Sequence, residues 1–491
     1  MIRNDKQAVN DRNDGTKLKL SLKNAVRKFS YSLSANTVSA VATTTMGLLI
    51  PIFLDVAQFG YWQLYIFYAG YAVYFHFGWA DGIYLRYGGK TSGDLDKPEM
   101  HSQFWLYIFF EFCLFLLVSM YALIFLKDID KRLIVFCVGL NCVVYLPRVM
   151  LQYLLQSIGQ VSEYARNLVH ERLLNVALML AFIFTGRRSY HYLIIADFLS
   201  KGITLIWLSY HCRDILFTRG IPLSLSFREA RENLKIGFKL MFATVASMLI
   251  IGIVQFAIAK EWDIATFGMV SFALVTAQSI VVFINQISMV LFPLLKQSER
   301  SKLPVVFHTM GSSISLPVML LLFLFYPLQV GLNLLLPNYT VGISYLAILF
   351  PICLFESRTS LLLSSFMKTF RKEDAMMKIN FFMVFLSILS TIVTIGIFRD
   401  IELGLFSIIA LLALRCVIAD IFVQRLISLN DFGELVQLLV SAVIFIIASW
   451  FIGGLMGWLI YGIYLVLAIL VRRKQYLVSL HVIGQSMKDR L

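Results

Sequence analysis

The stretch DVAQFG at residues 55–60 returns in nearly the same form as DIATFG at residues 263–268. Each stretch lies between two long apolar runs, so each is expected to form a short turn between two helices. A single six-residue match is weak support for an internal repeat. Its meaning depends on whether further matches occur in the same order and in the same structural context.

Apolar runs recur along the whole chain. Of 491 residues, 59% are hydrophobic and only 15% are charged, and the mean hydropathy is +0.77. A soluble protein has about 25% charged residues, whereas a membrane helix needs about 20 consecutive apolar residues. We therefore predict an all-α polytopic membrane protein with about 14 transmembrane helices. The first span is expected at 30–53 and the last at 456–471, with spans at 61–84 and 167–185 among those between them.

Further matches between the two halves support a duplication. Arg148 in CVVYLPR corresponds to Arg358 in CLFESR, and Asp197 in IIADF corresponds to Asp420 in VIADI. Matches in the same order at equivalent spans indicate that six spans have been copied. Because six is even, both copies begin on the same side of the membrane and form parallel repeats. Two pseudo-equivalent lobes of this kind are expected to enclose a cavity between them.

Spans and charge together predict the organisation of the chain. Its parts are an N-terminal tail (1–29), an N-lobe (30–210), an inter-lobe linker (211–236), a C-lobe (237–425), two added spans (436–471) and a C-terminal tail (472–491). Most of the 43 Lys and Arg residues lie on the side of the two tails, so the positive-inside rule predicts that both termini are cytoplasmic. The net charge of +14 is therefore attributed to topology and not to nucleic-acid binding. The second part of the linker is expected to be an amphipathic helix on the membrane surface.

The repeated turns also predict local contacts. We expect Asp55 and Asp263 to cap the helices that follow them, because Asp is a preferred N-cap residue. Gly60 and Gly268 are expected to let those helices pack closely, because glycine lacks a side chain.

Several ionisable residues lie deep in predicted spans, where a charge costs about 2.5–3.5 kcal/mol. Arginine binds phosphate through its fork of donors, and carboxylates bind cations or protons. The candidate substrate-binding residues are therefore Arg148, Arg358, Arg415, Lys201 and His76, and the candidate ion-coupling residues are Asp197, Asp420, Glu111 and Glu356.

Alternatively, these charges form ion pairs that stabilise the packing of neighbouring helices. Asp197 and Lys201 are four residues apart, and Arg415 and Asp420 are five apart. Arg148 has no acid within one turn, and Glu356 would face away from Arg358 on a helix. The sequence thus predicts that Arg148 and Arg358 are unpaired and share the wall of the cavity.

Motifs of enzymatic chemistry are missing from the sequence. It has no Gly-rich phosphate loop with Lys, no His/Cys metal spacing and no serine nucleophile elbow. The predicted cytoplasmic segments are too short for an ATPase domain. We expect no catalytic activity, cofactor or metal, and transport driven by an ion gradient or by the gradient of the substrate itself.

Two stretches resemble polysaccharide repeat-unit flippases of the multidrug/oligosaccharidyl-lipid/polysaccharide superfamily. They are VAQFGYWQLYIFYAGYAVYFHFGWADGIYLRYGGK (56–90) and LLQSIGQVSEYARNLVHERLL (154–174). The plan of six, six and two spans resembles this superfamily along most of the chain. The resemblance implies two bundles in a V and alternating access. It maps the functional cavity charges of the family onto Arg148, Arg358, Asp197, Arg415 and Asp420.

The implied substrate is an oligosaccharide on undecaprenyl diphosphate, moved from the inner to the outer leaflet of the bacterial inner membrane for O-antigen or capsule synthesis. The implied partners are this polyprenyl-diphosphate-linked oligosaccharide and membrane lipids, with a polysaccharide polymerase and a chain-length regulator as further candidates. No nucleic-acid partner is expected. Two added spans depart from many O-antigen flippases and are shared with lipid II flippases.

Three other functions compete with this one. A lipid II flippase would share the lipid diphosphate chemistry. A multidrug or organic-cation antiporter of the same superfamily would need an acidic, aromatic-lined pocket, which the deep basic residues do not favour. A membrane-embedded glycosyltransferase or polymerase would need a sizeable outer loop, and the predicted outer loops are short.

Overall fold

The computed structural model describes residues 31, 33–297 and 303–488, with the side chains of 283–297, 474 and 477–488 left out of the description. The predicted N-terminal tail at 1–29 lies outside the described residues. In the described part every regular element is a helix. Twelve of these helices are long and apolar enough to cross a membrane, or thirteen if one bent pair counts as a single span. The predicted all-α polytopic membrane fold is thereby confirmed.

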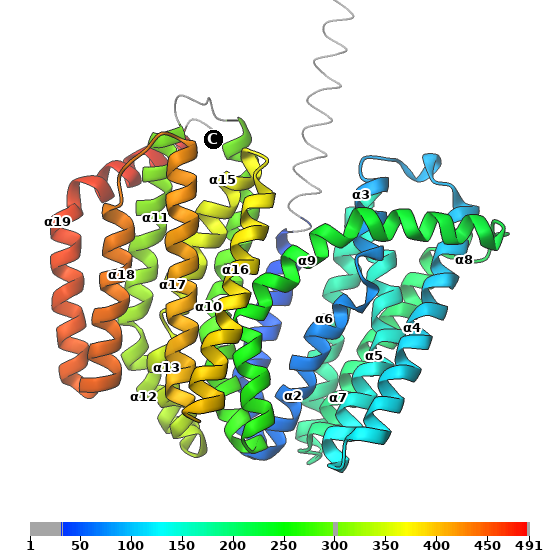
Figure 1. The fold of residues 1–491 in the computed structure, drawn as a ribbon, viewed down its shortest axis with the longest axis horizontal. Helices are drawn as coiled ribbons and strands as arrows, with labels where there is room; N and C mark the ends of the chain where they lie inside the picture. Colours follow the sequence, from blue (N-terminus) through cyan, green and yellow to red (C-terminus); the bar gives the residue numbers. More distant parts are fainter. Residues whose placement is uncertain (1–30, 32, 298–302, 489–491) are drawn as a thin grey trace, which may run out of the picture.

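The first group of helices forms one side of the molecule (Figure 1). It contains the first helix (Leu33–Phe53), α2 (Val56–Ala72), η1 (Val73–His76), α3 (Trp79–Tyr87), η2 (Ser92–Asp94), α4 (Lys97–Phe125), α5 (Ile129–Ser157), α6 (Val161–Phe184), α7 (Tyr190–His211) and α8 (Arg213–Leu216). The predicted span at 61–84 is broken, because Phe77 and Gly78 adopt positive φ angles of 49° and 89° between η1 and α3. We call this group the N-lobe.

The second group forms the opposite side and is called the C-lobe. It contains α10 (Ile264–Gln297), α11 (Leu303–Phe323), α12 (Phe325–Leu335), η4 (Pro337–Tyr339), α13 (Thr340–Leu349), α14 (Ile352–Ser357), the π-helical turn η5 (Arg358–Leu363), α15 (Ser364–Thr369), α16 (Glu373–Thr391), the π-helical turn η6 (Ile392–Ile397) and α17 (Ile401–Leu426). The chain bends by 118° between α12 and the η4–α13 segment.

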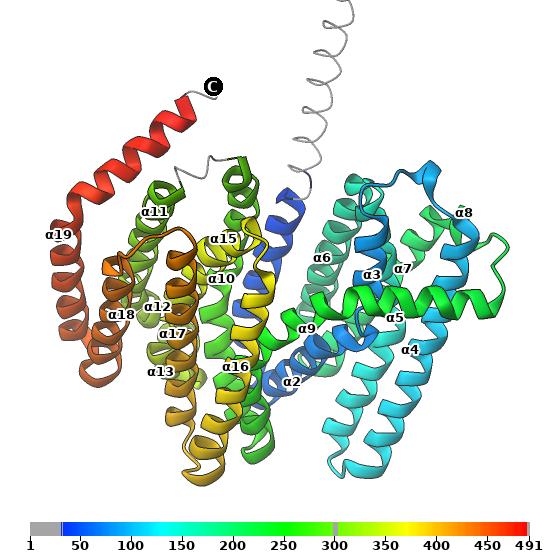
Figure 2. The same ribbon diagram turned by 45° about the horizontal axis from the view of Figure 1, so that its top comes forward.

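The last two spans are α18 (Gly433–Ile446), continued by the π-helical turn η7 (Ile447–Ile452), and α19 (Gly454–Lys488). Figure 2 places both on the side of the C-lobe that faces away from the N-lobe. The backbone of α19 departs from helical geometry at Arg472. These helices pack on α11, where the Tyr461 hydroxyl donates to the carbonyl of Met319 (3.2 Å).

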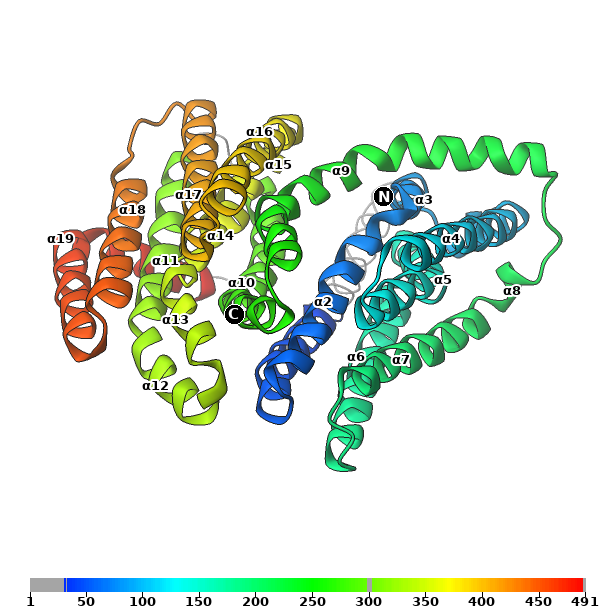
Figure 3. The ribbon, with the colours of Figure 1, turned by 60° about the horizontal axis from the view of Figure 1, so that its bottom comes forward.

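Helix α9 (Leu223–Glu261) joins the two lobes. Figures 1 and 3 show its first part running along the N-lobe before it turns into the C-lobe. A Cβ on Gly82 would lie 1.9 Å from the carbonyl oxygen of Asn233, so only glycine permits this crossing of α3 and α9. Arg86 on α3 fixes the contact through Asn233 Oδ1 (2.8 Å) and Glu229 Oε2 (2.7 Å).

The two repeated turns pack the starts of α2 and α10 against each other. A Cβ on Gly60 would lie 2.1 Å from the carbonyl oxygen of Ile264, and a Cβ on Gly268 would lie 2.9 Å from the Cα of Gly60. The predicted close packing at these glycines is confirmed, and the partner of each repeat is the other repeat. We call this end of the bundle the distal end, and the opposite end, which holds the α3–α4 and α7–α9 connections, the basic end.

The predicted helix caps are only partly correct. Asp263 Oδ1 accepts the backbone N–H of Thr266 (2.7 Å), and this hydrogen bond lowers the pKa of Asp263 below its ordinary value. Asp55 precedes α2 in an extended conformation, but its side chain makes no capping hydrogen bond, so that prediction was wrong. The turn at Asp55 is held instead by Tyr339, whose hydroxyl donates to the carbonyl of Leu54 (3.4 Å).

Candidate functional site

The N-lobe contains a network of five charged side chains, defined here as Arg148, Glu171, Arg172, Asp197 and Lys201. Glu171 Oε2 lies 3.7 Å from Arg148 Nη2 and 3.5 Å from Arg172 Nε. Lys201 Nζ lies 2.6 Å from Asp197 Oδ2, so the predicted pair four residues apart is confirmed. Three cations thus face two anions in this N-lobe network. Arg172 is its most exposed member, with 33% of its side chain accessible.

Arg148 is buried inside this network and does not stand unpaired. Its Nη2 faces Glu171 on α6, its Nη1 donates to Thr204 Oγ1 (3.3 Å), and its guanidinium lies over the Tyr145 ring. The prediction of an unpaired Arg148 was therefore wrong. Residue spacing within one helix turn could not indicate Glu171 as the partner of Arg148, because Glu171 lies on the neighbouring helix α6.

The C-lobe holds a second buried cluster, defined here as Arg358, Asp420 and Glu434. Arg358 Nε donates to Asp420 Oδ2 (2.5 Å) and its Nη1 donates to Glu434 Oε2 (3.3 Å). Ser312 Oγ also donates to Glu434 Oε1 (2.5 Å). The prediction of an unpaired Arg358 was wrong as well, since α17 and α18 each supply a carboxylate. In this C-lobe cluster two anions face one cation, which is the reverse of the balance in the N-lobe network.

A separate ion pair joins α17 to α14. Arg415 Nη2 donates to Glu356 Oε1 (2.5 Å) and its Nη1 donates to Ser247 Oγ on α9 (3.0 Å). The alternative of an Arg415–Asp420 pair is wrong, because Asp420 binds Arg358 instead. Arg415 therefore ties α17 to α14 and to the joining helix α9.

An inter-lobe cavity of about 440 Å³ lies between α2, α9, α10 and α14. Its wall is mostly apolar, with several neutral polar side chains and one carboxylate. The lining includes the amides and hydroxyls of Gln63, Gln255, Gln278, Ser247 and Ser271, the rings of Phe67 and Tyr71, and the carboxylate of Glu356. Since Glu356 is bound to Arg415, this cavity offers neutral hydrogen-bonding groups and aromatic faces.

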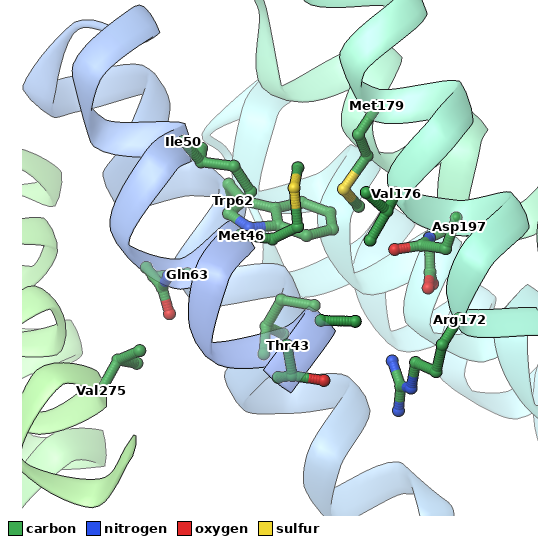
Figure 4. Close-up of a pocket in the computed structure, with 14 residues that line it drawn as sticks. Thr43, Met46, Ile50, Trp62, Gln63, Arg172, Val176, Met179, Asp197 and Val275 are labelled. Atoms are coloured by element: carbon green, nitrogen blue, oxygen red, sulfur yellow. The ribbon is translucent and has the colours of Figure 1, made fainter. Parts of the chain in front are cut away.

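A smaller N-lobe pocket of about 140 Å³ adjoins this cavity through the shared residues Gln63, Ile66 and Val275. Figure 4 shows Arg172 and Asp197 on one side of this pocket, with Trp62 and Met46 also in its wall. Asp197 is engaged by Lys201 and by the Tyr65 hydroxyl (2.6 Å). Arg172 is thus the cation that the N-lobe network presents to a ligand.

Of the nine predicted site residues, two line these two cavities within the described part of the chain, namely Asp197 and Glu356. Five other candidates form the ion pairs described above and do not line either cavity. They are Arg148, Lys201, Arg358, Arg415 and Asp420. The expected shared wall of Arg148 and Arg358 is therefore wrong, because each belongs to the cluster of its own lobe.

The two remaining candidates lie in the N-lobe interior. His76 is buried at the break before α3, where its Nδ1 accepts the backbone N–H of Gly78 (2.9 Å). Glu111 on α4 is fully buried, and neither of its carboxylate oxygens has a hydrogen-bond partner among the described residues.

Arg172 and Glu434 were missed by the sequence analysis. The signal for Arg172 is the charged run His-Glu-Arg at 170–172, which falls inside the predicted span at 167–185. Glu434 follows the turn before α18 and reads as a helix-terminal acid, so nothing in its local sequence indicates a buried pair.

Comparison with known proteins gives fold-level relatives. No family model and no curated protein matches the chain. Among solved structures, an inward-facing multidrug resistance MATE-family transporter of the MOP superfamily is similar over 82% of this chain and 98% of its own, with 13% identity and a TM-score of 0.58. The chain has the fold of the MOP-superfamily transporters. A second similar structure is described as the lipid II flippase MurJ in an inward closed conformation. The match covers 91% of the present chain and 99% of the MurJ chain, with 13% identity and a TM-score of 0.54.

The outward-facing form of a MATE-family transporter is also similar to the MOP-fold chain. It matches 82% of this chain and 95% of its own, with 12% identity and a TM-score of 0.51. All three of these structures are of transport proteins and none is of a catalytic enzyme. At this level of identity the likeness concerns the fold, so a substrate has to be argued from the side chains of this chain.

Proposed function

We propose that the chain is a flippase for lipid-linked oligosaccharide repeat units. It carries the undecaprenyl-diphosphate-linked sugar from the cytoplasmic to the outer leaflet of the bacterial inner membrane by alternating access. One observation carries this proposal: the N-lobe network has a surplus cation and presents Arg172 to a pocket that adjoins a neutral, amide-lined inter-lobe cavity. An anionic headgroup joined to neutral sugars fits these two neighbouring spaces.

The sugar part is assigned to the inter-lobe cavity. Gln63, Gln255 and Gln278 each offer both a donor and acceptors, which suits sugar hydroxyls. The rings of Phe67 and Tyr71 offer flat apolar faces for sugar rings. Since direct hydrogen bonds replace bound water here, the sugar can leave the aqueous phase without large cost.

The C-lobe cluster is proposed as the ion-coupling site. Asp420 and Glu434 share the guanidinium of Arg358, so this cluster holds two carboxylates and one guanidinium. The imidazole of His308 lies close by, with its Nδ1 3.9 Å from Glu434 Oε1. A buried charge in a membrane protein is expensive unless it is paired. Binding of H⁺ or Na⁺ at this cluster would remove that cost, and a gradient of either ion can then drive the conformational cycle.

The orientation and the protein partners are also proposals. Positive charge at the basic end supports a cytoplasmic location for both termini. A polysaccharide polymerase and a chain-length regulator would act on the flipped product on the other side of the membrane.

Export of organic cations is the main competing function. It would require an accessible unpaired acid, yet the carboxylates that line the two cavities are bound, Glu356 to Arg415 and Asp197 to Lys201. A lipid II flippase would use the same diphosphate chemistry, and only the sugar separates it from the proposed substrate.

Purified protein in proteoliposomes tests the proposal. A fluorescent polyprenyl-diphosphate-linked oligosaccharide is placed in the vesicles, and its movement between leaflets is followed by quenching from outside. We expect protein-dependent movement of this lipid and no uptake of the organic cation ethidium. Ethidium transport without lipid movement would instead identify a cation antiporter.

A further inference from the structure

Two cavities follow each other along the same pair of helices, the first helix and α6. The N-lobe pocket lies between Thr43 or Met46 of the first helix and Asn175 or Met179 of α6. A second cavity of about 280 Å³ continues the same interface toward the basic end. It is lined by Tyr31, Ser34 and Val38 from the first helix and by Arg166, Val169 and His170 from α6. We call this interface the first-helix/α6 seam.

Arg172 lines the N-lobe pocket and lies two residues after His170, which lines the second cavity. Its Nε donates to Ser39 Oγ on the first helix (3.0 Å), which joins the two helices at this point. In the described part of the chain the hydrogen bond and the ion pair of Arg172 both run through Nε. Its two terminal nitrogens are therefore left for an anionic ligand, and a guanidinium can hold two phosphate oxygens at once.

The wall of the seam combines hydrogen-bond donors and apolar groups. The guanidinium of Arg166 and the imidazole of His170 line the basic-end cavity, together with Val38 and Val169. The nearest acid, Glu163, lies 3.4 Å from Arg166, whose side chain is 56% exposed. An exposed pair of this kind contributes little energy, so Arg166 can exchange Glu163 for another anion. Such a wall suits a molecule with an anionic headgroup and an apolar chain.

We propose that the first-helix/α6 seam is a lateral access route for the phosphorylated headgroup of the lipid substrate. This inference rests on the proposed flippase function. Arg166 and His170 meet the diphosphate at the basic end, and Arg172 receives it in the N-lobe pocket. The apolar tail stays in the bilayer outside the seam. The Ser39–Arg172 contact closes the route in the present state, and the passing headgroup displaces it.

A removable staple across the seam tests the route. In the variant Val38→Cys/Val169→Cys, a bifunctional thiol reagent crosslinks the two introduced cysteines, and a reductant can cleave this crosslink. Lipid flipping is then measured in proteoliposomes. We expect the staple to slow flipping by about tenfold or more, and reduction to restore it. Each single-cysteine variant, treated in the same way, controls for reaction at the native cysteines and should flip at the wild-type rate.

The outcomes separate the route from the flippase function. If stapled protein flips the lipid as fast as unstapled protein, the route is wrong and the flippase function stands. If unstapled protein moves no lipid, the flippase function fails and the route fails with it. Inorganic diphosphate should bind stapled and unstapled protein equally, because the N-lobe pocket also adjoins the inter-lobe cavity.

The receiving role of Arg172 has its own measurement. Arg172→Gln should weaken binding of inorganic diphosphate about tenfold, since a charge-assisted bidentate contact is lost. Arg172→Lys should lose less, because the charge remains. Arg187→Gln is the matched control, because Arg187 lies in the distal turn before α7 and contacts Tyr192. Unchanged diphosphate binding by a folded Arg172→Gln protein would overturn the role of Arg172.

Discussion

The buried arginines show what a single residue can and cannot reveal about its partner. Asp197 and Lys201 share one helix face, so their pairing follows from their spacing. The partners of Arg148 and Arg358 come from other helices, so the sequence near each arginine does not predict them. The sequence therefore predicted several of the buried charges, but it did not indicate their partners Glu171 and Glu434. Because Arg148 and Arg358 are paired, Arg172 takes their place as the candidate ligand-binding cation.

Gly311 gives a prediction at the scale of one residue. An added Cβ at this position would lie 2.0 Å from Glu434 Oε2 and 3.5 Å from Arg358 Nη1. Gly311→Ala should therefore displace Glu434 and lower stability by about 1–3 kcal/mol, the usual range for overpacking. Thermal unfolding of the purified protein in detergent measures the loss.

A matched glycine separates this effect from helix propensity. Gly331 lies within α12, and an added Cβ there would meet nothing within 4 Å. Gly331→Ala should leave the unfolding temperature unchanged or raise it slightly, since Ala favours helix over Gly. Equal unfolding temperatures for the two variants would mean that Gly311 is not needed for the C-lobe cluster.

At the scale of elements, the apolar runs predicted where helices cross, but not where they break. The break before α3 has a sequence signal in Gly78, which adopts a left-handed conformation. The π-helical turns η5, η6 and η7 have no comparable signal, because one extra residue in a helix leaves the apolar pattern almost intact. The bend between α12 and α13 does have a local signal, because Pro337 begins η4 at the break and the residue before a proline disfavours helix.

The contact between α2 and α10 yields a prediction about gating. Gly60→Ala should force these helices apart at the distal end, because its Cβ would lie 2.1 Å from a backbone oxygen that cannot rotate away. We expect a cysteine at the buried position Phe59 to react faster with a membrane-impermeant thiol reagent in this background. Proteoliposomes in which the distal end faces the reagent measure the rate.

Gly70 on the same helix is the control for this experiment, since an added Cβ there would meet nothing within 4 Å. Gly70→Ala should leave the labelling of Phe59→Cys unchanged. If Gly60→Ala also leaves it unchanged, the glycine contact does not keep the distal end closed.

At the scale of the whole molecule, the two lobes share a topology but differ in charge. The N-lobe network has a surplus cation, whereas the C-lobe cluster has a surplus anion. The glycine contact between the repeats joins the two lobes at the distal end. Under the proposed function, substrate and coupling ion would bind in separate lobes and act on one shared conformational change, which is how a gradient is coupled to transport.

If the substrate binds in the N-lobe and the ion in the C-lobe cluster, a mutation should be able to remove ion coupling without stopping transport. Glu434→Gln removes the surplus charge of the C-lobe cluster while leaving the Arg358–Asp420 pair in place. Lipid flipping driven by the gradient of the lipid itself should continue, but an imposed H⁺ or Na⁺ gradient should no longer accelerate it. Glu402→Gln, at the exposed distal start of α17, should keep the full response. A Glu434→Gln protein that is still accelerated by the ion gradient would place the coupling site elsewhere, with the partnerless carboxylate of Glu111 in the N-lobe as the next position to test.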